Sequence, residues 1–104
     1  MGRSAKESEA LTLRHARPFD LWLHARGVSG AHAVLRLPGR QSEPSSLLLK
    51  KAAAIAAWHS KARGSAMVPV IVTPRKFVRK AKGAPVGQVI VTREDVLIVE
   101  PGLP

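Results

Sequence analysis

The sequence predicts a single α+β domain: a mostly antiparallel sheet of about five strands, one main helix packed on a face of it, and a short N-terminal helix. Three observations favour this class. An alternating stretch covers residues 20–37, an alanine-rich helical stretch covers 45–62, and β-branched runs cover 68–73, 87–92 and 96–100. At 104 residues, the whole chain is expected to be one domain, with its core between about residues 3 and 100.

Residues 20–37 predict a β-hairpin whose loop spans residues 26–30. An antiparallel register places apolar residues opposite one another on a core face, namely Leu21 with Leu35, Leu23 with Ala33 and Ala25 with Ala31. The other face receives Asp20, Trp22, His24, His32 and Arg36, with Asp20 opposite Arg36 and His24 opposite His32. We expect this polar face to support the fold or the shape of a bound ligand, with both histidines metal-free and serving as polar surface or hydrogen-bonding residues beside Trp22.

Two helices are predicted. Residues 4–16 begin with Ser4 and Glu7 in a capping-box pattern, and Pro18 ends that helix. The main helix spans residues 45–62, with Gly64 placed to terminate it. Its sheet-facing side is predicted to hold Leu48, Ala52, Ile55, Ala56 and His59, and its other side Lys50, Lys51, Trp58 and Lys61. His59 would then be a structural histidine at the helix–sheet interface.

The C-terminal half predicts three more strands and a basic arm. Residues 68–73 form a strand, and residues 74–85 form a loop or irregular arm with five cations in eight residues around Phe77 and Val78. Residues 87–92 and 96–100 are predicted to pair with each other as a second hairpin around the turn at 93–95.

The positive charge is concentrated in one half of the chain. The net charge is +10, and residues 44–93 contain ten Lys and Arg side chains without a single Asp or Glu. Such an asymmetry indicates a polyanionic partner. The expected nucleic-acid-binding residues are Lys50, Lys51, Trp58, Lys61, Arg63, Arg75, Lys76, Arg79, Lys80 and Lys82. Cations bind the phosphate backbone, and an indole beside them can shield the sheet or stack on a base.

Catalytic and cofactor motifs are missing from the sequence. There is no cysteine, HExxH pair, serine in a strained elbow or Gly-rich phosphate loop, so we predict no catalytic residue, metal or cofactor. Two alternatives stay open: an RNA-processing or RNA-modifying enzyme using Asp20, His24 and His32, and a protein-interaction module with a basic arm. No apolar run is long enough for a signal peptide or a membrane span, so a cytoplasmic location away from the membrane is expected.

Four stretches resemble a known family: GRSAKESEALTLRHARPFDLWLHARGVSGAHAVLRL, AAAIAAWHSKARGS, VPVIVTPRKFVRKAKGAPVGQVIV and LIVEPG. They are similar to NFACT-R, the C-terminal RNA-binding module of fibronectin-binding-like proteins of ribosome-associated quality control. The most specific matches are the 20–24 run, Gly30, His32, Ser60, Lys61, Lys76, Val78, Lys80, Lys82, Gly83, Pro85 and Gly87. The resemblance implies binding to tRNA, with ribosomal RNA of the large subunit and the ribosome as further partners. It implies no tailing activity, because that belongs to another domain of the family.

Overall fold

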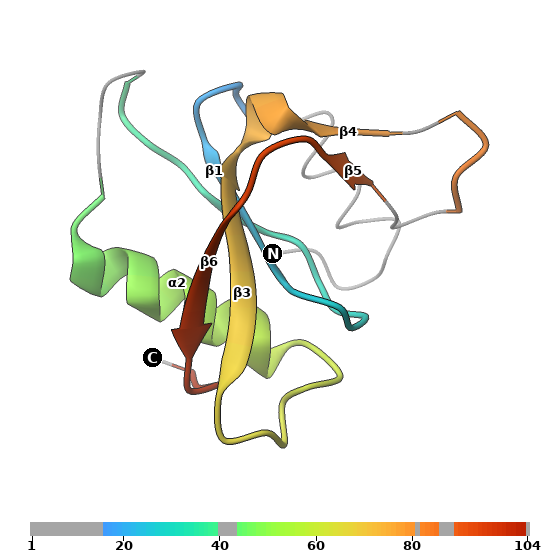
Figure 1. The fold of residues 1–104 in the computed structure, drawn as a ribbon. Coiled ribbons are helices and arrows are strands. Elements are labelled where there is room, and N and C mark those ends of the chain that lie inside the picture. The colour runs from blue at the N-terminus through green and yellow to red at the C-terminus, as the bar shows by residue number, and fades with distance from the viewer. Residues whose placement is uncertain (1–15, 40–43, 81, 86–88, 104) are drawn as a thin grey trace.

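The computed structural model describes residues 16–39, 44–80, 82–85 and 89–103 (Figure 1). Its strands are β1 (Leu21–Ala25), β2 (Ala33–Leu35), β3 (Val68–Pro74), β4 (Val78–Arg79), β5 (Ile90–Val91) and β6 (Asp95–Val99). Its helices are α2 (Ser46–Trp58) and a 3-10 turn (Arg75–Phe77). Strands β2-β1-β3-β6 form an antiparallel sheet, and β4 and β5 form a separate two-stranded sheet. The α+β class is confirmed, and the predicted N-terminal helix falls on residues that lie almost entirely outside this description.

The first hairpin has the predicted register. Leu21 pairs with Leu35, Trp22 with Val34 and Leu23 with Ala33. The ladder between β1 and β2 stops at Leu23, and the predicted pair of Ala25 with Ala31 does not form. Residues 29–31 bond to the end of α2 instead. Strand β1 also pairs along its whole length with β3, so it is central in the sheet.

Helix α2 covers the predicted core face of the sheet, although it uses a different side of its own surface. Ser45 caps it by accepting a hydrogen bond from the Leu48 N–H at 3.1 Å. The buried helix residues are Ala53, Ala56 and Ala57, which pack with the apolar side chains of β1, β3 and β6. Methyl side chains let the helix backbone approach the sheet closely. This explains why the alanine side of α2 faces the sheet, and the side with the longer aliphatic residues does not.

The prediction for Leu48 and His59 was therefore wrong, because both are exposed. Leu48 and Ile55 line an open apolar groove of about 380 Å³ between α2 and strands β1 and β2. The helix also ends earlier than predicted, at Trp58 instead of Ala62, so Gly64 does not terminate it. After Trp58, the chain bends into turns that are bonded to the loop after β1, where Gly30 and Ser60 form an isolated β-bridge.

The predicted second hairpin was wrong as well. Strand β6 pairs with β3, while β5 pairs with β4 in the small sheet. Pairing with β3 places Val99 beside Val68 in the helix-covered core, a burial that a hairpin with β5 would not provide. The basic arm is also more regular than expected, because it contains the 3-10 turn and β4, and Val78 is buried. Among the described residues, no helix is long and apolar enough to cross a membrane.

Candidate nucleic-acid interface

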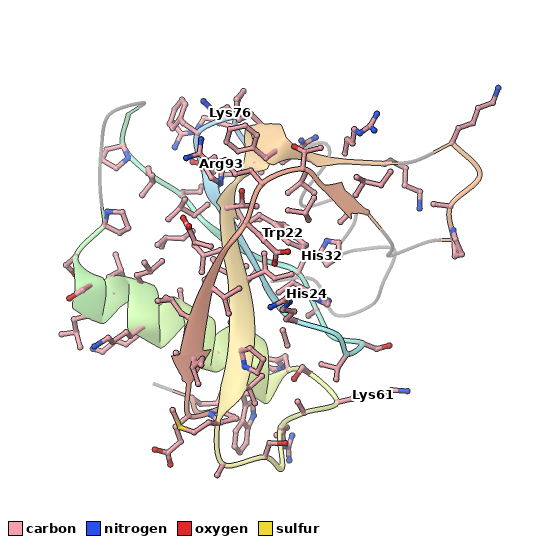
Figure 2. The ribbon with its side chains drawn as sticks, in the orientation of Figure 1. Trp22, His24, His32, Lys61, Lys76 and Arg93 are labelled. Atoms are coloured by element: carbon pink, nitrogen blue, oxygen red, sulfur yellow. The ribbon has the colours of Figure 1, made fainter. Side chains whose placement is uncertain are left out.

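The candidate cations lie at opposite ends of β3. Lys61 and Arg63 belong to the loop that leads into the strand, and Lys76 lies in the 3-10 turn that follows it. Figure 2 shows Lys61 and Lys76 at opposite ends of the molecule. Seven residues of strand separate the two groups, which corresponds to about 20 Å at the usual rise. Lys50 and Lys51 are exposed on α2. The structure thus divides the predicted interface into an arm and a helix-end loop and does not gather it at one spot.

In the arm, two cations share one aromatic ring. The Lys76 Nζ lies 5.2 Å from the centre of the Phe77 ring, and the Arg93 guanidinium carbon lies 5.7 Å from it. Both cations are exposed, and Figure 2 shows them together at one end of the molecule. Arg93 belongs to the acid-free half of the sequence but was not predicted as a site residue. The local sequence did not indicate a contact between Arg93 and Phe77, because the two residues come together only through the pairing of β4 with β5.

Two arm cations hold the shape of the arm. The Arg75 Nη1 donates to the Val78 carbonyl at 2.6 Å, and burial lowers the pKa of the Arg75 guanidinium. The Lys80 Nζ donates to the Pro85 carbonyl. By contrast, Arg79 and Lys82 are exposed, like Lys76. The arm therefore combines cations that are bonded to its backbone with cations that extend towards solvent.

At the end of α2, an arginine lies on a tryptophan. The Arg63 guanidinium carbon is 4.3 Å from the centre of the Trp58 ring. Arg63 and the neighbouring Lys61 are exposed, whereas Trp58 is half-buried. Within the described residues, the two ion pairs join Arg17 to Asp20 and Arg26 to Glu94, so no carboxylate is paired with Lys61 or Arg63 there.

The polar hairpin face is mostly an interior layer, which corrects the expectation of a polar surface. Trp22 is 2 % exposed and His32 is 1 % exposed, while His24 is half-buried. The indole of Trp22 stacks on His24 with ring centres 5.6 Å apart and planes 3° apart, and His32 meets both rings edge-on at 5.2 and 5.3 Å. Figure 2 shows the three side chains together beside the central strands.

The Asp20 carboxylate is satisfied within the fold. It accepts hydrogen bonds from the Arg17 N–H at 2.8 Å, the Leu37 N–H at 3.0 Å and the Arg17 guanidinium at 3.3 Å. Burial raises the pKa of the Asp20 carboxyl, but these hydrogen bonds outweigh that effect and hold its pKa below the usual value. Sequence reasoning set Asp20 against Arg36 and treated Arg17 only as the end of a helix, so it missed this pairing.

His24 connects the hairpin face to the helix-end loop. Its Nε2 lies 3.2 Å from the Gly30 carbonyl oxygen, to which the ring donates in the Nε2–H tautomer. Burial lowers the pKa of His24. Among the described residues, no group of three or more His, Asp or Glu side chains is arranged to hold a metal ion. The absence of a metal at the histidine pair stays a prediction.

Comparison with known proteins agrees with this architecture. Residues 1–93 match the family model described as the NFACT protein RNA binding domain. The chain belongs to this family. The chain is 38 % identical over 101 residues to the Rqc2 homolog RqcH of Bacillus subtilis (strain 168), and 34 % identical to the RqcH of Streptococcus pneumoniae serotype 2 (strain D39 / NCTC 7466).

These alignments cover 97 % of this NFACT RNA-binding domain but only 17 % and 18 % of the relatives, so the chain spans less than a fifth of their length. A similar solved structure is the C-terminal part of the fibronectin/fibrinogen-binding protein from Streptococcus suis, with a TM-score of 0.88 and 32 % identity. That match covers 97 % of this chain and 39 % of the other.

Proposed function

We propose that this domain binds structured RNA, tRNA or ribosomal RNA, through phosphate contacts, and that it does so on the ribosome during quality control in the cytoplasm. The observation that carries the proposal is the acid-free, ten-cation half of the sequence, most of whose cations are exposed in the structure. The RNA-binding family and the RqcH relatives support the same role.

The positions of the cations favour a long polyanion over a small ligand. The exposed cations form two groups at opposite ends of β3, a strand about 20 Å long. One group holds the arm cations Lys76, Arg79 and Lys82 with the neighbouring Arg93, and the other holds the loop cations Lys61 and Arg63. A phosphate backbone can contact both groups at once, and each contact adds affinity by releasing counterions. A single nucleotide or a small anion could reach only one group.

We propose further that the domain is not an enzyme. An enzyme acting through Asp20, His24 and His32 would need these groups to reach a substrate. The Asp20 side chain is fully buried and its oxygens already accept from Arg17 and Leu37, while the His32 ring lies inside the aromatic layer. A general base must come within hydrogen-bond reach of the proton it takes, and neither residue meets that requirement here.

Binding of labelled tRNA at a series of salt concentrations tests the proposal. We expect tight binding at low salt and a steep linear fall of the logarithm of the association constant with the logarithm of salt concentration. Binding that ignores salt, or no binding at low salt, would rule the proposal out. Capture of protein partners that survives nuclease treatment would instead support the alternative of a protein-interaction module, and turnover of the RNA would support the enzyme.

A further inference from the structure

We propose that the Trp58–Arg63 pair is a stacking site for an unpaired nucleobase, so that the domain prefers RNA with a single-stranded segment over a fully paired duplex. The proposal rests on the proposed RNA-binding function and adds a specific recognition element to it. It is carried by the geometry at the end of α2, where a guanidinium lies 4.3 Å from the centre of an indole ring.

The pair offers a flat, charged surface to solvent. The Arg63 guanidinium carbon lies over the Trp58 ring, and Arg63 is exposed, so the side of Arg63 away from the indole is accessible to a second planar group. Unpaired bases stack on aromatic rings and on guanidinium planes, whereas bases inside a duplex are already stacked on their neighbours. Phosphate binding alone requires no aromatic partner. A planar cation on an indole is suited to a base, and the exposed Lys61 ammonium two residues away can bind an adjacent phosphate.

The site is held in place before any ligand binds. The Arg63 N–H donates to the Ser60 carbonyl at 3.2 Å and the Lys61 N–H donates to the Ser29 carbonyl at 2.9 Å, while Gly30 and Ser60 form a β-bridge. A Cβ atom on Gly30 would lie 2.9 Å from the Cβ of Ser60, so the close approach of the two loops depends on glycine there. A loop fixed in this way loses little conformational entropy when a base stacks on it.

The test uses three RNA probes: a blunt duplex, the same duplex with a short unpaired adenosine tail, and that tailed duplex with abasic nucleotides in the tail. The last two have the same phosphates, so their difference isolates stacking from charge. We expect the wild-type protein to bind the adenosine tail about tenfold more tightly than the abasic tail.

Two variants separate a stacking role from a structural one. Trp58→Phe keeps an aromatic ring under the guanidinium and should therefore keep the preference for the adenosine tail. Arg63→Lys keeps the positive charge but replaces the planar guanidinium, and it should lose most of the preference for the adenosine tail over the abasic tail. The ratio of the two affinities is compared, because the two probes carry the same phosphates and any change in phosphate binding cancels. Because Arg63 is exposed, this variant is expected to fold.

Equal affinity of the wild type for adenosine and abasic tails, with the blunt duplex still bound, would overturn the stacking site and leave the proposed RNA-binding function intact. No binding of any of the three probes at low salt would refute the proposed function itself. A preference that survives in Arg63→Lys would also overturn the assignment, because another surface would then bind the base.

Discussion

Replacing Lys76, Arg79 and Lys82 together with glutamine should weaken RNA binding without unfolding the domain. All three side chains are exposed. Lys76 loses its contact with the Phe77 ring at 5.2 Å, and an exposed cation–π contact contributes about 0.5–1 kcal/mol. The far-UV circular dichroism spectrum should be unchanged, and the melting temperature should fall by no more than a few degrees.

The expected change in salt dependence follows from the number of exposed cations removed. Each phosphate contact contributes about 0.7–0.9 to the slope of log affinity against log salt, so three contacts contribute roughly 2–3 units. Between roughly 50 and 200 mM salt, the wild type should then lose about 20- to 40-fold more affinity than the variant. Titration of fluorescently labelled tRNA by anisotropy at several salt concentrations measures both slopes.

Arg75→Gln is the matched control because Arg75 belongs to the same arm but is half-buried and donates to the Val78 carbonyl. It should cost about 1–2 kcal/mol of unfolding free energy, since a charged hydrogen bond is lost, and should leave the salt slope nearly unchanged. A triple variant that unfolds, or that keeps the wild-type slope, would show that the arm is structural and that RNA binds elsewhere on the domain.

Three further predictions concern the fold that positions these cations. Gly30→Ala should lower the free energy of unfolding by about 1–3 kcal/mol, measured in urea, because its new Cβ would overlap Ser60. Gly64→Ala is the control and should change stability little, because its Cβ would meet nothing within 4 Å. Equal effects of the two substitutions would contradict this reasoning. Thr73→Val should stabilise the domain by about 1 kcal/mol, since the buried Thr73 hydroxyl has no hydrogen-bond partner among the described residues. A loss of stability would indicate a hydrogen bond to this hydroxyl. His24→Gln should make the stability of the domain fall less steeply as the pH drops below about 6.5. Burial lowers the pKa of His24, so the unfolded state binds the proton at a higher pH than the folded state, and protonation favours unfolding. An unchanged pH profile of stability in the variant would show that His24 is not responsible.

The parts of the fold that follow from local patterns could be predicted from the sequence. Alternation along residues 20–37 gave the hairpin register, because a slip of one residue would have exposed Leu23 and buried charged residues in the apolar core. The existence of α2 followed from its alanine content and from Ser45. The sequence did not show which side of α2 is buried, because alanines occupy several sides of the helix and a small residue fits equally well at an interface or in solvent.

The predictions that were wrong depended on contacts between segments that are distant in the sequence. The β-branched runs identified β5 and β6 as strands, but alternation does not specify which strand pairs with which, and a short polar turn suggested a hairpin that the structure does not form. In the same way, the alternation assigned one set of side chains of the 20–37 hairpin to a polar face, but it did not predict that most of this face is buried. The structure nevertheless buries both Trp22 and His32 on that face.

The resulting arrangement explains why most of the candidate cations lie towards the ends of the sheet. Helix α2, which carries Lys50 and Lys51 on its exposed side, covers one face of the sheet, and the Trp22 layer fills much of the other, so the remaining cations are left for the loops and the arm. The strand between the two cation groups is about 20 Å long, beyond the Debye length of about 8 Å at physiological salt, so the repulsion between the two groups is largely screened. A nucleic-acid duplex carries one phosphate charge per roughly 1.7 Å of its axis, so one RNA can neutralise both groups. Affinity should therefore rise with RNA length until the RNA spans β3, because the second group then binds intramolecularly at a high effective concentration.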